Sequence, residues 1–166
     1  MSSPYSCQAT TRRGKSGWKE QRESISEENK ALARRSWEII NQHNPDLIDE
    51  MYTPDFVWHE PNQDIHGSEE AKQFVGTFFE AFPDLQVTVE DEIAQGDKVV
   101  TRWTISGTHQ GELMGIAPTE KQIELKGITI HRFEGDRIAE EWERYDNLGM
   151  MQQLGVIPDE PGQGGS

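Results

Sequence analysis

The chain has 166 residues, a formal net charge of -14 at neutral pH and a single cysteine, Cys7. This length suits one domain with tails, and the lone cysteine excludes intrachain disulfides and thiolate metal sites. The acidic charge disfavours nucleic acid, whose phosphates it would repel, and we see no apolar run long enough for a bilayer span or a secretory signal. We therefore expect a cytoplasmic protein with neither nucleic acid nor a membrane as its partner.

The N-terminal part of the chain is predicted to be a tail followed by helices. Residues 1–23 hold five basic residues among Ser and Gly, with few apolar positions, and this composition predicts a disordered basic tail. Ser24 opens a helix capping box with Glu27, and the apolar stripe that follows predicts a helix over about 26–43. Pro45 suits the first turn of a second, short helix with its own apolar face.

A strand and a third helix are predicted next. The stretch DFVWHEP indicates a short strand, with Phe56 and Trp58 on one side and His59 on the other. A helix is predicted over about 69–82, where apolar residues, Phe78 among them, recur at the spacing of one buried face. Both elements therefore present an apolar face that needs a partner layer.

The rest of the chain changes to the pattern of strands. Four strands are predicted over residues 85–94, 99–109, 121–133 and 138–146. A last short helix is predicted over 147–154 and a flexible tail over 158–166. Helices first and long antiparallel strands second indicate an α+β fold, with three N-terminal helices packed on one face of a strongly curved, mostly antiparallel sheet. We expect one domain over residues 24–157, a cone whose interior can hold a small molecule.

Three histidines are candidates for the wall of such a pocket. His59 lies on the predicted strand before the third helix, His109 closes the second long strand, and His131 lies within the third long strand among apolar residues. A buried imidazole needs hydrogen-bond partners, and the acid-rich fourth strand can supply them. We predict no metal site, because neither HxH nor HExxH occurs, and no nucleotide cofactor, because no phosphate-binding glycine loop occurs.

The last predicted hairpin sets His131 against a strand that carries several carboxylates. A two-residue turn would set His131 opposite Glu140, whereas a three-residue turn would set His131 opposite Glu141 and Thr129 opposite Glu143. Local sequence leaves both registers open, and it also leaves open that all these acids form a solvated outer face. A carboxylate that faces a dry pocket would suit general acid or base catalysis, because burial shifts its pKa toward neutral pH.

Three stretches of the chain resemble a known family. They are NQHNPDLIDEMYTPDFVWHEP, GTHQGELMGIAPTEKQIELKGITIHRFEGDRIAEEWERYD and MMQQLGV, and the similarity covers about residues 28–157. They are similar to the SnoaL-like polyketide cyclases, also named ester cyclases, of the nuclear-transport-factor-2-like superfamily. The resemblance implies a cone-shaped α+β barrel that closes a polyketide ring by intramolecular aldol condensation. It also implies a carboxylate beside a histidine as acid and base, without metal or cofactor.

The resemblance further implies which residues carry the chemistry. It places the family's catalytic aspartate at Glu143 and its partner histidine at Thr129, so both positions depart from the family's residues. His131 lies two residues along on the same face and could supply the imidazole, and the match favours the register in which Glu141 faces inward. In the other register, Asp146 becomes the candidate acid.

We therefore predict a cofactor-free enzyme that abstracts or shuttles a proton next to a carbonyl group of a hydrophobic small molecule. Glu143 would be the acid and base, His131 would polarise the carbonyl or orient the carboxylate, and Thr129 would add a hydrogen bond. The other candidate substrate-binding residues are His59, Phe78, Trp103, Glu141 and His109. A homodimer is expected, because partner subunits commonly cover the exposed faces of such open sheets. Two alternatives stay open: a non-catalytic binding module, which Thr129 favours, and a related isomerase, dehydratase or epoxide hydrolase.

Overall fold

A computed structural model describes residues 15–158 of the chain. Its elements are α1 (Lys15–Ser36), α2 (Glu38–Asn41), α3 (Leu47–Met51), β1 (Tyr52–His59), β2 (Asp64–His66), α4 (Gly67–Ala81), β3 (Gln86–Gln95), β4 (Lys98–Thr108), β5 (Gln122–Glu134), β6 (Arg137–Tyr145) and α5 (Asn147–Gln153). The four long strands and the last helix lie within one or two residues of their predicted positions. None of the helices described is long and apolar enough to cross a membrane.

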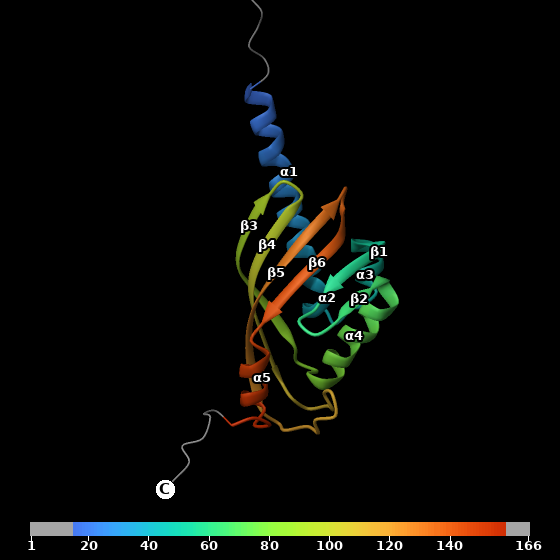
Figure 1. Cartoon of the computed structure of the whole chain (residues 1–166), viewed down its shortest axis with the longest axis vertical. Helices are drawn as coiled ribbons and strands as arrows, with labels where there is room; N and C mark the ends of the chain where they lie inside the picture. The colour runs from blue at the N-terminus through green and yellow to red at the C-terminus, as the bar shows by residue number, and fades with distance from the viewer. Residues whose placement is uncertain (1–14, 159–166) are drawn as a thin grey trace, which may run out of the picture.

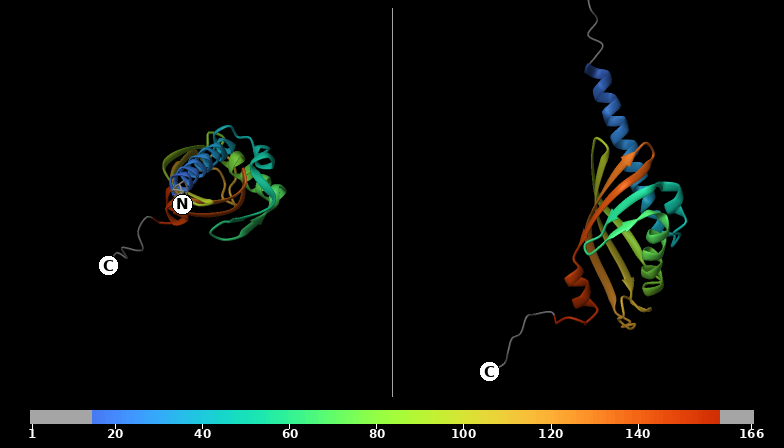
Figure 2. Two further views of the ribbon diagram at one scale, coloured as in Figure 1. Left: turned by 90° about the horizontal axis from the view of Figure 1, so that it is seen from above. Right: turned by 45° about the vertical axis from the view of Figure 1, so that its right-hand side comes forward.

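The six strands form one curved sheet that does not close into a ring. Its order is β2-β1-β6-β5-β4-β3, and all neighbours are antiparallel except β1 and β6, which run parallel. α1 lies along β3 and β4, and α4 lies along β1, so helices cover the concave side of the sheet (Figures 1 and 2). The fold is an open cone of the α+β class, which confirms the predicted fold class.

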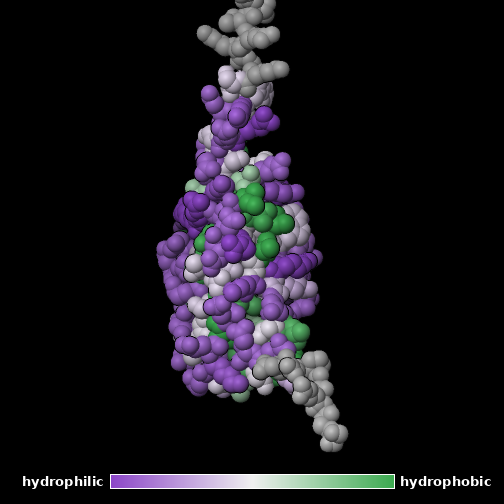
Figure 3. Space-filling model, turned by 90° about the vertical axis from the view of Figure 1, so that its left-hand side faces the viewer, coloured by the Kyte–Doolittle hydropathy of each residue, from purple (hydrophilic) through white to green (hydrophobic). Residues whose placement is uncertain are grey.

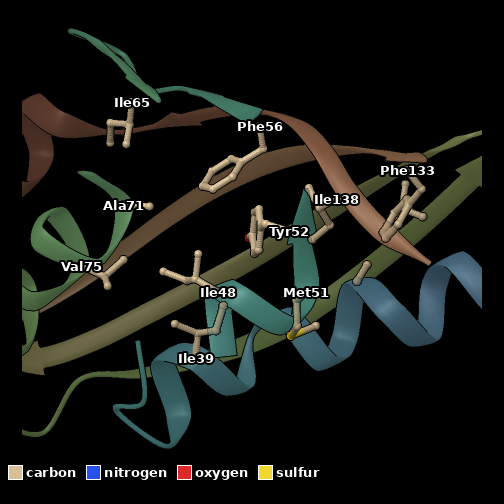
Figure 4. Packing of buried hydrophobic residues seen from close by; sticks show 12 residues of the cluster. Ile39, Ile48, Met51, Tyr52, Phe56, Ile65, Ala71, Val75, Phe133 and Ile138 are labelled. Carbon is tan, nitrogen blue, oxygen red and sulfur yellow. The ribbon is translucent and has the colours of Figure 1, made fainter. Parts of the chain in front are cut away.

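Apolar side chains from the helices and the sheet meet inside the cone. Ile48 of α3, Phe56 of β1 and Val75 of α4 are each at most 5% exposed and belong to one cluster, whose side chains converge in Figure 4. A second cluster surrounds Trp103 and Phe82. Burying one such side chain contributes about 1.5–3 kcal/mol, so the two clusters hold the helices on the sheet and fix the shape of the interior.

The first helix differs from its prediction at both ends. Residues 15–23, which were expected to be disordered, belong to α1, because the run WKEQRE favours a helix more than the Ser and Gly before it. The helix predicted over 26–43 is divided, since a turn at Trp37 separates α1 from α2. The remaining parts of the predicted tails, 1–14 and 159–166, lie outside the described residues.

The register of the hairpin between β5 and β6 is set by a bulge. The strands are joined by a two-residue turn, but Ala139 has no partner of its own on β5. This one extra residue shifts the pairing, so that His131 faces Glu141 and Thr129 faces Glu143. The structure therefore has the register that was expected from a three-residue turn, but this register results from a two-residue turn and the bulge at Ala139.

Candidate active site

A cavity of about 100 Å³ lies between the concave face of the sheet and helices α2, α3 and α4. One enclosed water needs roughly 10–15 Å³, so this space suits a small organic molecule. The wall is mostly apolar and aromatic, and both Phe78 of α4 and Trp103 of β4 belong to it, as the sequence predicts. The polar residues of the wall include Glu60, His131, Glu141, Glu143 and Tyr145.

Glu143 is held at this wall from two sides. Its side chain points inward on β6, and the residue is only 6% exposed. The indole N–H of Trp58 donates to Glu143 Oε2 at 3.2 Å, and the hydroxyl of Thr129 donates to Glu143 Oε1 at 3.1 Å. The Thr129 oxygen accepts in turn from Trp103 Nε1 at 2.8 Å. Thr129 is fully buried and does not line the cavity, so it supports the carboxyl group from behind the wall.

Glu60, directly after β1, lies against Glu143. The pairing of β1 with β6, in which His59 lies beside Trp142, continues to place Glu60 beside Glu143, and the Tyr145 hydroxyl donates to Glu60 Oε2 at 3.1 Å. Burial raises the pKa of Glu143 well above its usual range, and the charge of Glu60 raises it further. Burial also raises the pKa of Glu60, but hydrogen bonds from Glu143 and Tyr145 oppose this rise. Glu143 therefore holds a proton more tightly than Glu60.

Glu141 is the direct partner of His131. Its Oε2 atom lies 3.4 Å from His131 Nε2 and accepts a hydrogen bond from the Tyr52 hydroxyl at 2.9 Å. Burial and the charge of Glu141 raise the pKa of Tyr52 well above its usual range, so Tyr52 stays a donor. The His131 ring meets Trp37 edge-on, with 5.8 Å between ring centroids. The predicted imidazole is thus on the wall, and its carboxylate partner is Glu141.

His59 was predicted to bind substrate, but it lies on the opposite face of the sheet. Its two ring nitrogens lie 2.8 Å from Asp64 Oδ1 and 3.0 Å from Glu140 Oε1, and its ring stacks on Trp142. The hydrogen bond to Glu140 raises the pKa of His59. Strand alternation explains this position, because Trp58 of the same strand faces the cavity.

Two further candidates, His109 and Asp146, lie directly after the ends of β4 and β6 and do not line the cavity. His109 is fully buried after β4, where it packs on Phe82 and places Nδ1 3.0 Å from Thr119 Oγ1. It fills the protein interior and is not part of the wall. Asp146 follows β6 and caps α5, accepting a hydrogen bond from the Gly149 amide at 2.8 Å. The alternative register, which would make Asp146 the acid, is wrong, because His131 pairs with Glu141.

Sequence reasoning missed three polar contributors from β1 and the residue that follows it. No role in the site was expected from the sequence for Tyr52, for Glu60 or for the indole N–H of Trp58. The signal for Glu60 was present, because Phe56, Trp58 and Glu60 follow one another at the period of two that defines one face of a strand. The parallel pairing of β1 with β6, which brings Glu60 to Glu143, could not be read from local pattern.

The arrangement suits proton transfer in a largely apolar space. A buried carboxyl group whose pKa is raised above its usual range can hold a proton and give it to a ligand. The hydrogen bonds from Trp58 and Thr129 fix Glu143, so its acid group is oriented before any ligand enters. Within residues 15–158, no group of three or more His, Cys, Asp or Glu is arranged to hold a metal ion.

Gly127 leaves the space that Trp103 occupies behind Glu143. A Cβ atom at this position would overlap the Trp103 ring and lie 2.9 Å from the Arg144 carbonyl oxygen. We expect Gly127→Ala to displace the ring, disturb its bond to Thr129 and lower the free energy of unfolding by about 1–3 kcal/mol. Urea unfolding followed by tryptophan fluorescence measures this loss.

Gly76→Ala is the matched control, because the added Cβ has no atom within 4 Å apart from its chain neighbours and the backbone of its own helix. This substitution in the interior of α4 is expected to leave stability unchanged or to raise it by up to about 1 kcal/mol. Equal stability of the Gly127 variant and the wild-type protein would show that Trp103 can move without cost.

The comparison with protein families gives one match. A sequence model of the family described as SnoaL-like polyketide cyclase matches residues 30–154, which include all the strands and most of the helices around the cavity. No protein from the curated set matches the chain.

Solved structures resemble this chain over most of its length. AclR from Streptomyces galilaeus, a proposed hydroxylase, is 30% identical with a TM-score of 0.73, over 82% of this chain and 86% of its own. A proposed SnoaL-like polyketide cyclase from Jannaschia sp. CCS1 is 26% identical with a TM-score of 0.72, over 81% and 96%. An NTF2-like protein of unknown function from Burkholderia pseudomallei K96243 shares the fold at 18% identity, with a TM-score of 0.66 over 76% and 97%.

Proposed function

Because the chain belongs to the family of SnoaL-like polyketide cyclases, we propose that it is an enzyme that closes a ring in a hydrophobic, polyketide-like molecule. The observation that carries the proposal is Glu143, a buried carboxyl group with a raised pKa on the wall of an apolar cavity. Such a group can exchange protons with a substrate at neutral pH. An intramolecular aldol condensation needs this exchange and no cofactor.

Three residues have distinct roles in this proposal. Glu143 is the acid and base. His131 lines the cavity beside Glu141 and polarises the carbonyl group of the substrate. Thr129 does not reach the substrate, and it positions Glu143 through the 3.1 Å hydrogen bond. The apolar wall binds the hydrophobic body of the substrate and keeps water away from the enolate that forms.

A non-catalytic binding module on the same fold is the weaker alternative. That function would be favoured by a wholly apolar pocket with Glu143 turned to solvent. Instead, Glu143 is 6% exposed, and Trp58 and Thr129 hold it in place. A buried carboxyl group costs stability, and catalysis gives a reason to keep it.

Acetophenone provides a direct test, because it joins an apolar ring to a carbonyl group with exchangeable protons on the adjacent carbon. The wild-type protein is expected to exchange these protons for deuterium in D2O faster than buffer alone, as measured by proton NMR. This test follows the abstraction step and does not require the natural substrate. Exchange at the buffer rate would contradict the proposed function.

We also propose that two copies of the chain pair through the outer face of the sheet. Four apolar residues form one row across this face, where Ile93, Val100, Ile130 and Trp142 are neighbours on β3, β4, β5 and β6. Ile93 is 65% exposed, and Figure 3 shows hydrophobic surface gathered in a patch on this side of the molecule. Exposed apolar patches of this kind mark interaction sites, and a second copy would cover the row with its own.

Ile130→Glu tests this pairing. The substitution places a charge at the centre of the apolar row, and in a two-fold interface it places two like charges close together. Light scattering after size exclusion is expected to give the mass of a dimer for the wild-type protein and of a monomer for the variant. Gln73→Glu, on the exposed side of α4, is the control and should remain a dimer. A monomeric wild-type protein at all concentrations would contradict the pairing.

A further inference from the structure

We propose that Glu60 is a second catalytic carboxyl group and that it shares a single proton with Glu143. This inference rests on the proposed function and refines it: Glu143 keeps the role of acid, and the role of base passes from Glu143 to Glu60. The argument starts from the position of Glu60, which comes from a part of the sequence far from Glu143.

Glu60 reaches the cavity because β1 lies parallel to β6. The pairs Trp58 with Glu141 and His59 with Trp142 carry the chain forward so that the next residue comes to lie beside Glu143. Glu60 is only 7% exposed, and its side chain is on the cavity wall. It can therefore touch a bound substrate, as Glu143 can.

The position of the two carboxyl groups favours one proton between them. Glu60 and Glu143 lie side by side on the buried cavity wall, where two ionised carboxylates would carry only acceptors and repel each other, so one of them keeps a proton and can donate it to the other. The environment decides where this proton stays. The Tyr145 hydroxyl donates to Glu60, and the Arg144 guanidinium lies near enough to favour a negative charge there. Glu143 is therefore the protonated partner and Glu60 the ionised one.

This division supplies a base and an acid at the same moment. The Glu60 carboxylate removes a proton from the carbon next to one carbonyl group, which breaks a C–H bond and gives an enolate. The enolate carbon attacks a second carbonyl group of the same molecule and forms the C–C bond. Glu143 gives its proton to the oxygen of that carbonyl group, which becomes a hydroxyl group.

The shared hydrogen bond also restores the site after each turnover. At the end of the reaction Glu60 carries the proton and Glu143 is ionised. The proton then returns from Glu60 to Glu143 through the bond that joins them. No proton is gained or lost overall, so the cycle requires no acid from the solvent.

Carbon NMR of side-chain carboxyl groups, with 13C-labelled glutamate, tests the shared proton in the wild-type protein and in Glu60→Gln. In the wild-type protein one carboxyl group of the pair is expected to keep its proton well above the ordinary range. In Glu60→Gln the titration of Glu143 should move to lower pH, because the neighbouring charge that raised its pKa is gone. An unchanged Glu143 titration would overturn the shared proton. Glu140→Gln, on the outer face of β6, is the control and should leave the Glu143 titration unmoved.

Acetophenone exchange tests the catalytic role of Glu60. Glu60→Gln keeps an oxygen for the Tyr145 hydroxyl, so the variant is expected to fold, which circular dichroism verifies, and to lose at least as much exchange activity as Glu143→Gln. Wild-type activity in Glu60→Gln, with activity lost in Glu143→Gln, would overturn the role of Glu60 and leave the proposed function standing. Exchange at the buffer rate by the wild-type protein would instead overturn the proposed function and the role of Glu60 together.

Discussion

Glu143→Gln is expected to lower the exchange of acetophenone α-protons by about 100-fold or more, the usual contribution of a positioned acid or base. Glutamine has nearly the same shape, and its single oxygen can keep the hydrogen bond from Trp58 while its NH2 group turns toward the Thr129 hydroxyl, but its amide cannot supply a proton to a carbonyl oxygen. The loss should therefore appear in the rate at saturating acetophenone, with little change in its binding. Proton NMR in D2O measures the rate over a range of acetophenone concentrations.

Glu140→Gln is the matched control for this experiment. Glu140 lies on the same strand, but it faces outward and pairs with His59 and Arg132, so its substitution should leave exchange at the wild-type rate. If Glu143→Gln also exchanges at that rate, Glu143 is not part of the mechanism. Equal losses in the two variants would indicate damage to β6 as a whole.

The fold could be predicted because its elements are marked by local patterns. The apolar spacing of α4 and the alternation along the four long strands are each visible within about ten to fifteen residues. The type and order of these elements then leave few ways to bury their apolar faces. β2 was missed, because a strand of three residues, Asp64–His66, carries too short a pattern to be distinguished from a loop.

The candidate site was predictable only in part, because its geometry depends on pairings between distant segments. Glu143 and His131 lie on adjacent strands of one hairpin, and the family resemblance selected the register that brings both inward. The bulge at Ala139 that produces this register leaves no clear mark in the sequence. Glu60 is separated from Glu143 by more than eighty residues of chain, and only the parallel pairing of β1 with β6 joins them.

The errors among the histidines have a common physical reason. A histidine close to apolar residues can be inside a pocket, inside the packed core or on the outer face of a strand, and composition does not separate these cases. His59 is outside by alternation and His109 is in the core by packing, while His131 alone of the three lines the cavity. A polar residue that alternates with large aromatic residues, as Glu60 does, is a better guide to the wall.

Glu143→Gln is also expected to stabilise the protein increasingly as the pH rises above 4.5, the ordinary pKa of glutamate. Burial raises the pKa of Glu143 in the folded protein, so between pH 4.5 and that raised value the folded protein holds a proton that the unfolded chain has lost. The free energy of unfolding therefore falls with pH, by up to about 1.4 kcal/mol per pH unit for this one group. The glutamine side chain of the variant cannot titrate, so the variant lacks this loss. Urea unfolding at a series of pH values measures the difference.

The stability of Glu140→Gln relative to the wild-type protein should change with pH in the opposite direction. This variant is therefore the control for the direction of the effect. The hydrogen bond from His59 lowers the pKa of Glu140, so Glu140 stabilises the fold above its ordinary pKa and loses this effect as the pH falls. Its variant should therefore be the less stable protein at neutral pH and approach the wild type in acid. If the wild-type protein and Glu143→Gln unfold with the same pH dependence, Glu143 is ionised in the folded state and cannot be the proton donor. In that case a proton on Glu143 would account neither for the loss of stability with rising pH nor for catalysis. Another group of the cavity would have to be the proton donor.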